Sequence, residues 1–310
     1  MRRIIISSFL VMIIFIMSAC NNSVPKKNEK KIIDFNSQNA NLLNIMTTNK
    51  FLCDMVNDIT EGKQNTEYMF KNDGDMDSFT YTDDSINNIS RKDLFIYFGA
   101  GLEPWSDDFV NSLKKNKVSI INVSRGIRLL TFTKTDITLK ENYNPYYWLS
   151  TENYKIALFN VKNAVEEKDS INRDYYEQNF AQATKKIDDC EKQIKPIYEK
   201  YKNYNFVVDG DNLDYFTKNE DLKTIKYYSY DIIYALNQKD EFDKLDKKLK
   251  NVDNLVFLYD SEDSLKANQL IINKYNMKTA KITNGSGNMD YLTILKSNAD
   301  SINKSINKTN

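Results

Sequence analysis

Apolar side chains recur at helical spacing through residues 172–202. They are separated alternately by four and three positions, and Lys, Asp, Glu and Gln fill many of the positions between them. The apolar stripe consists of Tyr176, Phe180, Ala183, Ile187, Cys190, Ile194, Ile197 and Tyr201. This spacing predicts one amphipathic helix, roughly 45 Å long, that would reach across a domain and connect two parts of the protein. A helix packed on a single core would show the same spacing. We expect Pro196 to kink the helix or to end it near Lys195.

Shorter apolar runs alternate with amphipathic segments on both sides of this helix. Before it, strands are predicted at 42–46, 65–70, 94–98 and 118–123, with helices at 50–59, 85–89, 106–114 and 151–167. After it, strands are predicted at 205–208, 225–228, 255–258 and 278–282, with helices beginning near Tyr215 and covering 264–275 and 291–306. This rhythm is typical of parallel sheets covered by helices. We therefore predict an α/β fold of two similar parallel-sheet lobes bridged by one long helix. The expected boundaries are an N-terminal lobe at 37–168, a linking helix at 169–203 and a C-terminal lobe at 204–310.

The first 20 residues have the three parts of an export signal. Arg2 and Arg3 precede an apolar run at 4–16, which is shorter than a membrane-spanning helix needs to be. The residues MSA then lead directly to Cys20. Small residues before a cysteine are typical of a bacterial lipobox, in which the cysteine becomes the lipidated first residue; the alternative is an ordinary secretory signal with a chance cysteine. We expect a lipoprotein signal peptide at 1–20 and a flexible tether at 21–36, with the protein anchored through Cys20 to the extracytoplasmic face of the cell membrane.

Composition narrows the classes of function. The chain has 310 residues, of which 41% are hydrophobic and 12% aromatic, so it can bury a substantial core. Lys and Arg equal Asp and Glu at 43 each, so no basic excess points to a nucleic-acid partner. The chain contains no histidine, which removes the commonest zinc ligand and the usual general base near neutral pH. With no nucleophile motif either, we expect a protein that is not an enzyme.

Two cysteines remain beyond the signal, and both lie among apolar residues. Cys53 belongs to the apolar run at 51–56, and Cys190 belongs to the stripe of the long helix. We expect two buried thiols, which is the usual state of cysteines in such surroundings. Because an exported protein meets an oxidising environment, a disulfide between them stays open as the alternative.

Ligands of open parallel sheets bind beyond the carboxyl ends of the strands. In this chain the polar segments at those ends are 75–77, 144–148, 209–211 and 283–287. They contain Asp77, Asp209 and Asp211, together with Asn144, Tyr146 and Asn284. These segments are therefore the predicted ligand site.

Several motifs occur in a fixed order along the chain. They are IMTT at 45–48, DLFIY at 93–97, GLEPW at 101–105, VSRGI at 123–127, NPYYWL at 144–149, and Asp211 followed by Tyr215 and Phe216. In this order and spacing, and over nearly the whole mature chain, the sequence resembles the solute-binding lipoproteins of bacterial zinc and manganese ABC transporters. The resemblance implies two lobes bridged by a rigid long helix, with a metal held between the lobes and delivered to a membrane permease.

The chain departs from this family at the metal ligands, which are usually three histidines and one carboxylate. The corresponding positions here are Asp77, Tyr146, Gly210, and Thr283 or Asn284. None keeps its usual identity, so zinc bound by the usual histidine site is not expected, and the bound cofactor is unknown.

Three roles stay open for the residues at these positions. Asp77 and Asp211 are candidate metal ligands, with Asp209, Tyr146 and Asn284 as further candidate ligand residues, because oxygen ligands suit Mn²⁺, Ca²⁺ or Mg²⁺. The same aspartates could instead cap helices and turns at strand ends. The aromatic residues at 146–148 could hold an organic ligand or a metal–chelator complex, or they could be packing residues, and packing is favoured for Trp148.

These observations predict a lipid-anchored, extracytoplasmic solute-binding protein of a metal-type ABC importer with a divergent ligand site. Its expected partners are an ABC permease and, through Cys20, the lipid bilayer, and we expect a monomer. The alternative is a degenerate solute-binding fold that has lost its metal and serves as a surface adhesion or interaction protein.

Overall fold

The computed structural model describes residues 33–37, 42–114, 116–133, 142–229, 239–285 and 289–308. Residues Phe35–Asn310 form one compact unit, and the description below concerns that unit alone. The predicted signal peptide at 1–20, including Cys20, and most of the predicted tether at 21–36 lie outside the described residues. Within the part of the chain that is described, no helix combines the length and the apolar composition needed to cross a bilayer.

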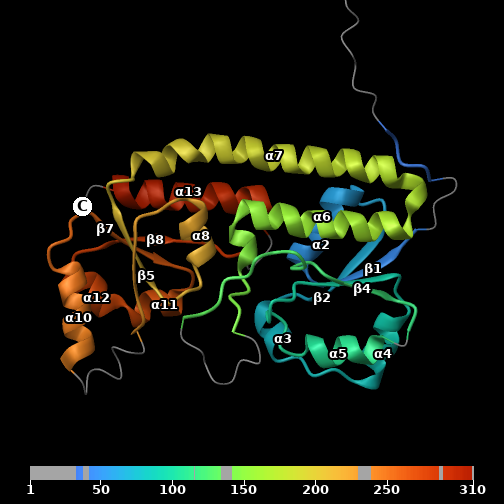
Figure 1. The fold of residues 1–310 in the computed structure, drawn as a ribbon, viewed down its shortest axis with the longest axis horizontal. Coiled ribbons are helices and arrows are strands. Elements are labelled where there is room, and N and C mark those ends of the chain that lie inside the picture. Colours follow the sequence, from blue (N-terminus) through green and yellow to red (C-terminus); the bar gives the residue numbers. More distant parts are fainter. Residues whose placement is uncertain are drawn as a thin grey trace, which may run out of the picture. The chain divides into compact units, whose positions relative to one another are not determined.

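Two parallel sheets with the same strand order form the centres of the two lobes (Figure 1). The first contains β1 (Asn44–Asn49), β2 (Asn65–Phe70), β3 (Leu94–Tyr97) and β4 (Ser119–Asn122), in the order β2-β1-β3-β4. The second contains β5 (Asn205–Asp209), β6 (Thr224–Tyr227), β7 (Leu255–Tyr259) and β8 (Lys278–Lys281), in the order β6-β5-β7-β8. Equivalent strands therefore occupy equivalent places, and the predicted α/β fold with two similar parallel-sheet lobes is confirmed.

Four helices of the N-terminal lobe lie between its strands in the chain. They are α2 (Lys50–Thr60), α3 (Asp73–Asp77), α4 (Asp83–Ser90) and α5 (Ser106–Leu113). The side chain of Asn49 starts α2 by accepting a hydrogen bond from the Leu52 amide, which satisfies one of the free amides at a helix start. Helix α5 buries Phe109 against Phe95 and Trp105. The short helix α3 was not predicted, because the acidic segment that forms it has no apolar periodicity.

The helices of the C-terminal lobe are α8 (Asp214–Asn219), α10 (Lys239–Leu249), α11 (Glu262–Ala267), α12 (Gln269–Lys274) and α13 (Tyr291–Asn307). The single helix predicted at 264–275 is two helices that meet at Asn268. The buried Asn268 amide donates to the Ser264 carbonyl and to Asp209, and its oxygen accepts from the Tyr227 hydroxyl. These side-chain bonds compete with the backbone bonds of a continuous helix, so the helix is interrupted at Asn268. The apolar spacing continues through the interruption, which is why the sequence predicted one helix. Helix α10 was not predicted.

The long helix α7 (Arg173–Lys200) packs against α13 of the C-terminal lobe and against α2 and α6 (Thr151–Lys168) of the N-terminal lobe, as Figure 1 shows. Its predicted stripe is buried at Tyr176, Ile187, Cys190 and Ile194. The helix therefore spans both lobes rather than packing on a single core.

Pro196 lies inside α7, and the helix continues to Lys200, so the expected end near Lys195 is wrong. A proline removes one backbone hydrogen bond from a helix. Contacts beyond it compensate, because Tyr198 packs on Phe216 and the Tyr201 hydroxyl donates to Asn303. Tertiary contacts with α8 and α13 thus hold the last turn in place.

Both described cysteines are buried free thiols, which confirms the expectation for Cys53 and Cys190 and excludes a disulfide between them. Cys53 lies on α2, and Cys190 on α7 faces the Leu292 carbonyl of α13. Burial raises the pKa of each thiol, so neither is poised to react at neutral pH.

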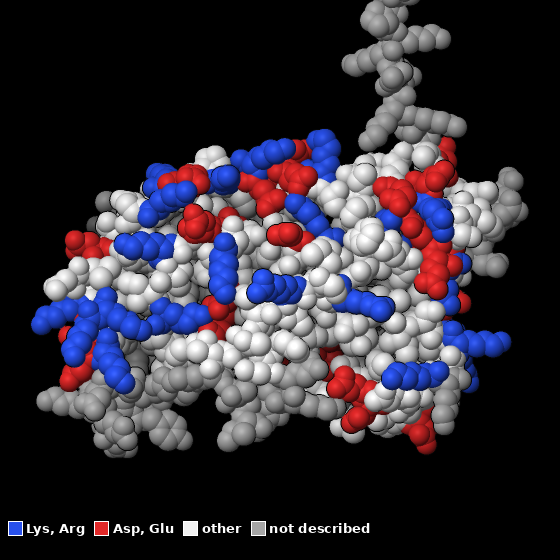
Figure 2. Space-filling view, viewed as in Figure 1, with Lys and Arg blue, Asp and Glu red and all other residues white. Residues whose placement is uncertain are grey.

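Charged side chains of both signs are interspersed on the face shown in Figure 2. Several of them are paired along the long helix. Lys155 of α6 contacts Asp188 and Glu191 of α7, and Lys185 pairs with Asp189 within α7. Exposed pairs of this kind add little to stability, so the fold depends mainly on its apolar contacts.

Candidate ligand site between the two lobes

The candidate residues of the C-terminal lobe lie where β5 ends. Asp209 is the last residue of β5, and Asp211 follows after one turn residue, Gly210. Gly210 has φ of +79°, a conformation that glycine adopts without the strain other residues incur. Gly210, to which the resemblance assigns one of the metal-ligand positions, is thus a turn residue with no side chain.

Asp211 is the most enclosed of the candidate carboxylates, with only 4% of the residue exposed. Its side chain accepts hydrogen bonds from the Thr133 amide at 2.7 Å, the Tyr228 hydroxyl at 2.9 Å and the Lys226 ammonium at 2.5 Å. Burial alone would raise the pKa of Asp211, but these donors lower it below the ordinary value of 3.8. Lys226 also contacts Asp214. Asp211 is therefore an ionised carboxylate that already has an internal cation.

Asp209 is occupied by contacts within its own lobe. One carboxylate oxygen accepts from the Ser229 amide at 2.7 Å, and the other accepts from the Asn268 side chain at 2.9 Å. These bonds join the end of β6 to the junction of α11 and α12. The sequence left two roles open for Asp209, which were stabilising a turn and binding a ligand. These bonds are of the turn-stabilising kind.

The segment that contains Tyr146 crosses to the C-terminal lobe. Asn144 donates from its side chain to the Asp211 carbonyl at 2.6 Å and accepts from the Tyr146 amide at 3.0 Å. The ring centroids of Tyr146 and Trp148 are 5.7 Å apart, and the Trp148 indole donates to the Asn284 carbonyl at 2.6 Å. The structure thus gathers Tyr146, Asp211 and Asn284 around one segment.

Asp77 lies on the N-terminal side, at the end of α3, with an exposed side chain. The Trp105 indole donates to the Met76 carbonyl at 2.9 Å and fixes α3 against the N-terminal lobe. Among the described residues, no group of three or more His, Cys, Asp or Glu side chains is arranged to hold a metal ion. The metal-ligand roles of Asp77 and Asp211 stay predictions.

An aromatic cluster lies beneath this segment and joins the lobes. Trp148 packs on Phe98 at 4.6 Å and on Phe51 at 5.9 Å between ring centroids. Tyr291 of α13 stacks on Tyr154 of α6 and donates its hydroxyl to the Trp148 carbonyl at 2.9 Å. Trp148 is 4% exposed, so it is a packing residue, as the sequence favoured.

Two charged residues near the site were not among the predicted site residues. Lys226, the counterion of Asp211, lies in β6, a strand that the sequence predicted. The only sign of its role in the sequence is that a lysine stands in an otherwise apolar run. Glu103 is 1% exposed and accepts hydrogen bonds from the Phe98 amide at 2.9 Å, the Gly99 amide at 3.0 Å and the Thr48 hydroxyl at 2.8 Å. Burial raises the pKa of Glu103 to about 7 even though these donors lower it. Glu103 closes the turn at the end of β3.

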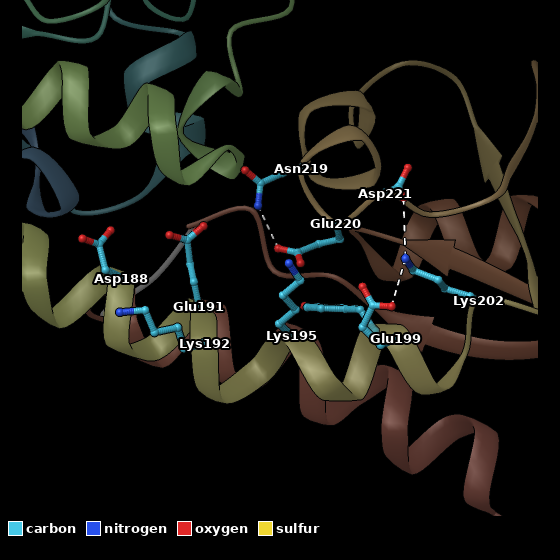
Figure 3. A pocket seen from close by; sticks show the side chains of 10 residues that line it. Asp188, Glu191, Lys192, Lys195, Glu199, Lys202, Asn219, Glu220 and Asp221 are labelled. Carbon is cyan, nitrogen blue, oxygen red and sulfur yellow. Dashed lines mark hydrogen bonds and ion pairs between the residues drawn. The ribbon is translucent and has the colours of Figure 1, made fainter.

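A separate cavity of about 540 Å³ lies beside α7, at the end of α8 remote from Asp211 (Figure 3). Its lining includes Glu191, Lys195, Glu199, Lys202 and Glu220. Lys202 pairs with Glu199, and the Glu220 carboxylate accepts from Asn219. The mixed and mutually paired charges give this cavity no clear ligand preference, and it lies away from the carboxyl ends of the strands.

Comparison with known proteins identifies a family and relatives with similar sequences. The sequence profile of the family described as zinc-uptake complex component A, periplasmic (ZnuA), matches residues 45–305. A metal ABC transporter substrate-binding lipoprotein of Lactococcus lactis is 27% identical over 191 residues, which cover 60% of this chain and 57% of the relative. The manganese ABC transporter substrate-binding lipoprotein PsaA of Streptococcus pneumoniae is 24% identical over 196 residues, 62% of this chain and 59% of the relative. The matched part is thus less than two thirds of either relative.

Solved structures share the fold at low sequence identity. The metal-dependent lipoprotein YcdH of Bacillus subtilis superposes with a TM-score of 0.67 at 20% identity, covering 86% of this chain and 99% of that chain. The Zn(II)-bound ZnuA-like domain of AdcA from Streptococcus pneumoniae gives a TM-score of 0.66 at 15% identity, covering 86% of this chain and 100% of that chain. Both similarities concern the fold alone.

Proposed function

We propose that this chain, which belongs to the family of periplasmic zinc-uptake complex component A proteins, is the solute-binding component of a metal-type ABC importer and not an enzyme. The observation that carries this proposal is the pair of lobes with the same strand order, joined by α7, with ligand segments at the carboxyl ends of the strands. Relatives named as substrate-binding lipoproteins of metal ABC transporters support it. The partner in this proposal is an ABC permease.

We also propose that Cys20 is lipidated and anchors the protein to the extracytoplasmic face of the membrane. The signal-like residues 1–20 and the lipoprotein names of two relatives support this. The polar segment at 21–36 then serves as the tether between the anchor and the compact unit.

The ligand site in this proposal is divergent. The usual histidine site for zinc does not fit, because the chain has no histidine and the enclosed carboxylate Asp211 is already paired with Lys226. The sequence left open a bare oxygen-ligated metal, an organic ligand and a metal held in an organic complex, and of these we favour the metal complex. Tyr146, beside the junction of the lobes, offers an aromatic surface for such a ligand.

Uptake measurements test the importer role. In cells that lack this chain, we expect the uptake of one transition metal, among manganese, zinc and iron, to fall several-fold, and we expect the wild-type chain to restore it. Asp77→Ala tests the predicted ligand site, with Asp84→Ala of α4 as the control for an exposed aspartate, and only Asp77→Ala should lower uptake. Unchanged uptake of all three metals without the chain would reject the importer role.

The surface adhesion or interaction protein is the second candidate function. The observation that favours it is the Lys226–Asp211 pair, which occupies a candidate ligand carboxylate and connects to the N-terminal lobe through Thr133. Normal metal uptake together with loss of surface attachment, in cells that lack the chain, would favour this candidate over the importer.

A further inference from the structure

We infer that the ammonium of Lys226 takes the cation position beside Asp211, so that the two lobes are linked through Asp211 without a metal and bare divalent cations are excluded there. This inference deepens the proposed function, and rests on it, because it assigns the class of solute that the candidate ligand site rejects. Lys226 is then a specificity-determining residue of the binding site.

The carboxylates of Asp211 and Asp214 both have ammonium partners. The side chains of Asp211 and Asp214 are only 2% and 12% exposed, and both contact the Lys226 ammonium. The other oxygen of Asp214 lies 3.9 Å from the ammonium of Lys218. Two carboxylates are thus matched by two ammonium groups. A divalent cation bound by Asp211 and Asp214 would have to displace their ammonium partners and would be repelled by both lysines.

The paired carboxylate also forms one of the contacts between the lobes. Asp211 accepts from the Thr133 amide and hydroxyl at 2.7 and 3.2 Å, and its carbonyl accepts from Asn144 at 2.6 Å. Nearby, the Leu130 amide donates to the Tyr215 hydroxyl at 2.6 Å. The segments around Thr133 and Asn144 also bond to each other, because Phe132 donates to the Asn142 carbonyl. A pair of N-terminal-lobe segments is therefore clamped onto the C-terminal lobe.

A tethered ammonium has an advantage over a free ion. Lys226 is part of β6, which pairs with β5, so its side chain is held beside Asp211. Its local concentration there does not depend on the concentration of metal in the surrounding solution. A bare cation would have to displace this group and leave a lysine partly buried beside a second positive charge, which is costly. A metal whose charge is already satisfied by an organic chelator does not face this requirement.

The thermal response to metal tests the inference in the full-length chain. We expect the wild type to show no stabilisation by millimolar Mn²⁺ or Ca²⁺. Lys226→Met removes the charge that Asp211 and Asp214 share and leaves the enclosed Asp211 without its cation, so the melting temperature should fall by roughly 5–10 °C. Because binding to the folded state stabilises it, Mn²⁺ at about 100 times its Kd should recover several degrees of this loss.

Lys155→Met is the matched control. The Lys155 side chain is 27% exposed, as is that of Lys226, and it also contacts two carboxylates, those of Asp188 and Glu191. We expect no metal-dependent recovery in this variant. An equal recovery in both variants, or Mn²⁺ stabilisation of the wild type that Asp211→Asn abolishes, would overturn the inference.

A direct measurement covers the case in which Lys226→Met does not fold. The spectrum of free Mn²⁺ in electron paramagnetic resonance reports how much of the ion is bound. We expect wild type and Asp211→Asn to bind Mn²⁺ equally, and weaker binding by Asp211→Asn would contradict the exclusion. These readouts do not depend on uptake, so the inference and the importer role can fail separately.

Discussion

Replacing Trp148 with alanine should lower the free energy of unfolding by about 3–5 kcal/mol, the usual cost of truncating a buried tryptophan. The indole is enclosed by Phe51, Phe98 and Tyr147, and its N–H donates to the Asn284 carbonyl across the lobe junction. The variant therefore loses a large apolar surface and the indole hydrogen bond to the Asn284 carbonyl. Urea unfolding followed by circular dichroism measures the loss.

The chain's other tryptophan provides the control. It has two, and Trp105 is also buried, but it packs wholly within the N-terminal lobe, on Phe70, Phe79 and Phe109. Trp105→Ala should cost a similar amount of stability. Only Trp148→Ala should increase hydrogen exchange in the first turn of α13, where Tyr291 donates to the Trp148 carbonyl. Equal exchange in the two variants would show that Trp148 is not the joint between the lobes.

A milder change separates the indole N–H from the ring. Trp148→Phe keeps an aromatic ring against Phe98 and removes only the donor to Asn284 and part of the surface. Its cost should therefore be clearly smaller than that of Trp148→Ala, because a single net hydrogen bond contributes about 1 kcal/mol. The same variant leaves Trp105 as the only indole, so its fluorescence reports on the N-terminal lobe alone.

Much of the fold could be predicted because the buried positions of strands and helices recur at regular intervals, and apolar residues occupy them in the sequence. Each of the eight predicted strands overlaps an observed strand, and four positions of the predicted stripe of α7 are buried. The errors have local causes that apolar spacing does not register. Asn268 divides one predicted helix through its side-chain hydrogen bonds, and tertiary contacts carry α7 past Pro196.

The candidate site was less predictable because its electrostatics depend on strand pairing. The acidic residues at the end of β5 were visible in the sequence, and the absence of histidine was decisive against the usual zinc site. The pairing of Asp211 with Lys226 was not visible. It arises because β6 lies beside β5 with Lys226 opposite Val208, from where a long side chain reaches the turn that follows Asp209. That register is a property of the folded sheet.

Glu103 should make the protein less stable as the pH rises from about 4.5 to about 7. Its pKa is about 7 in the folded protein against a usual value of 4.5, so the folded state holds this proton more tightly than the unfolded chain does. The carboxyl group therefore favours folding most below pH 4.5, and this contribution is lost as the pH rises through 7. The difference corresponds to roughly 3 kcal/mol at about 1.4 kcal/mol for each pKa unit.

Glu103→Gln removes this titration while keeping a side chain of nearly the same shape. The amide loses one acceptor towards the Phe98 and Gly99 amides, but that cost is the same at every pH. The free energy of unfolding of the variant minus that of the wild type should therefore increase by roughly 3 kcal/mol between about pH 4.5 and about pH 8. Urea unfolding at both pH values measures this difference, and all other titrating groups cancel from it.

Glu152→Gln, which replaces an exposed carboxylate in the first turn of α6, is the control and should follow the wild type at both pH values. Parallel profiles for Glu103→Gln and the wild type would mean that Glu103 stays ionised in the fold, held by the Thr48 hydroxyl and the two amides against the cost of its burial.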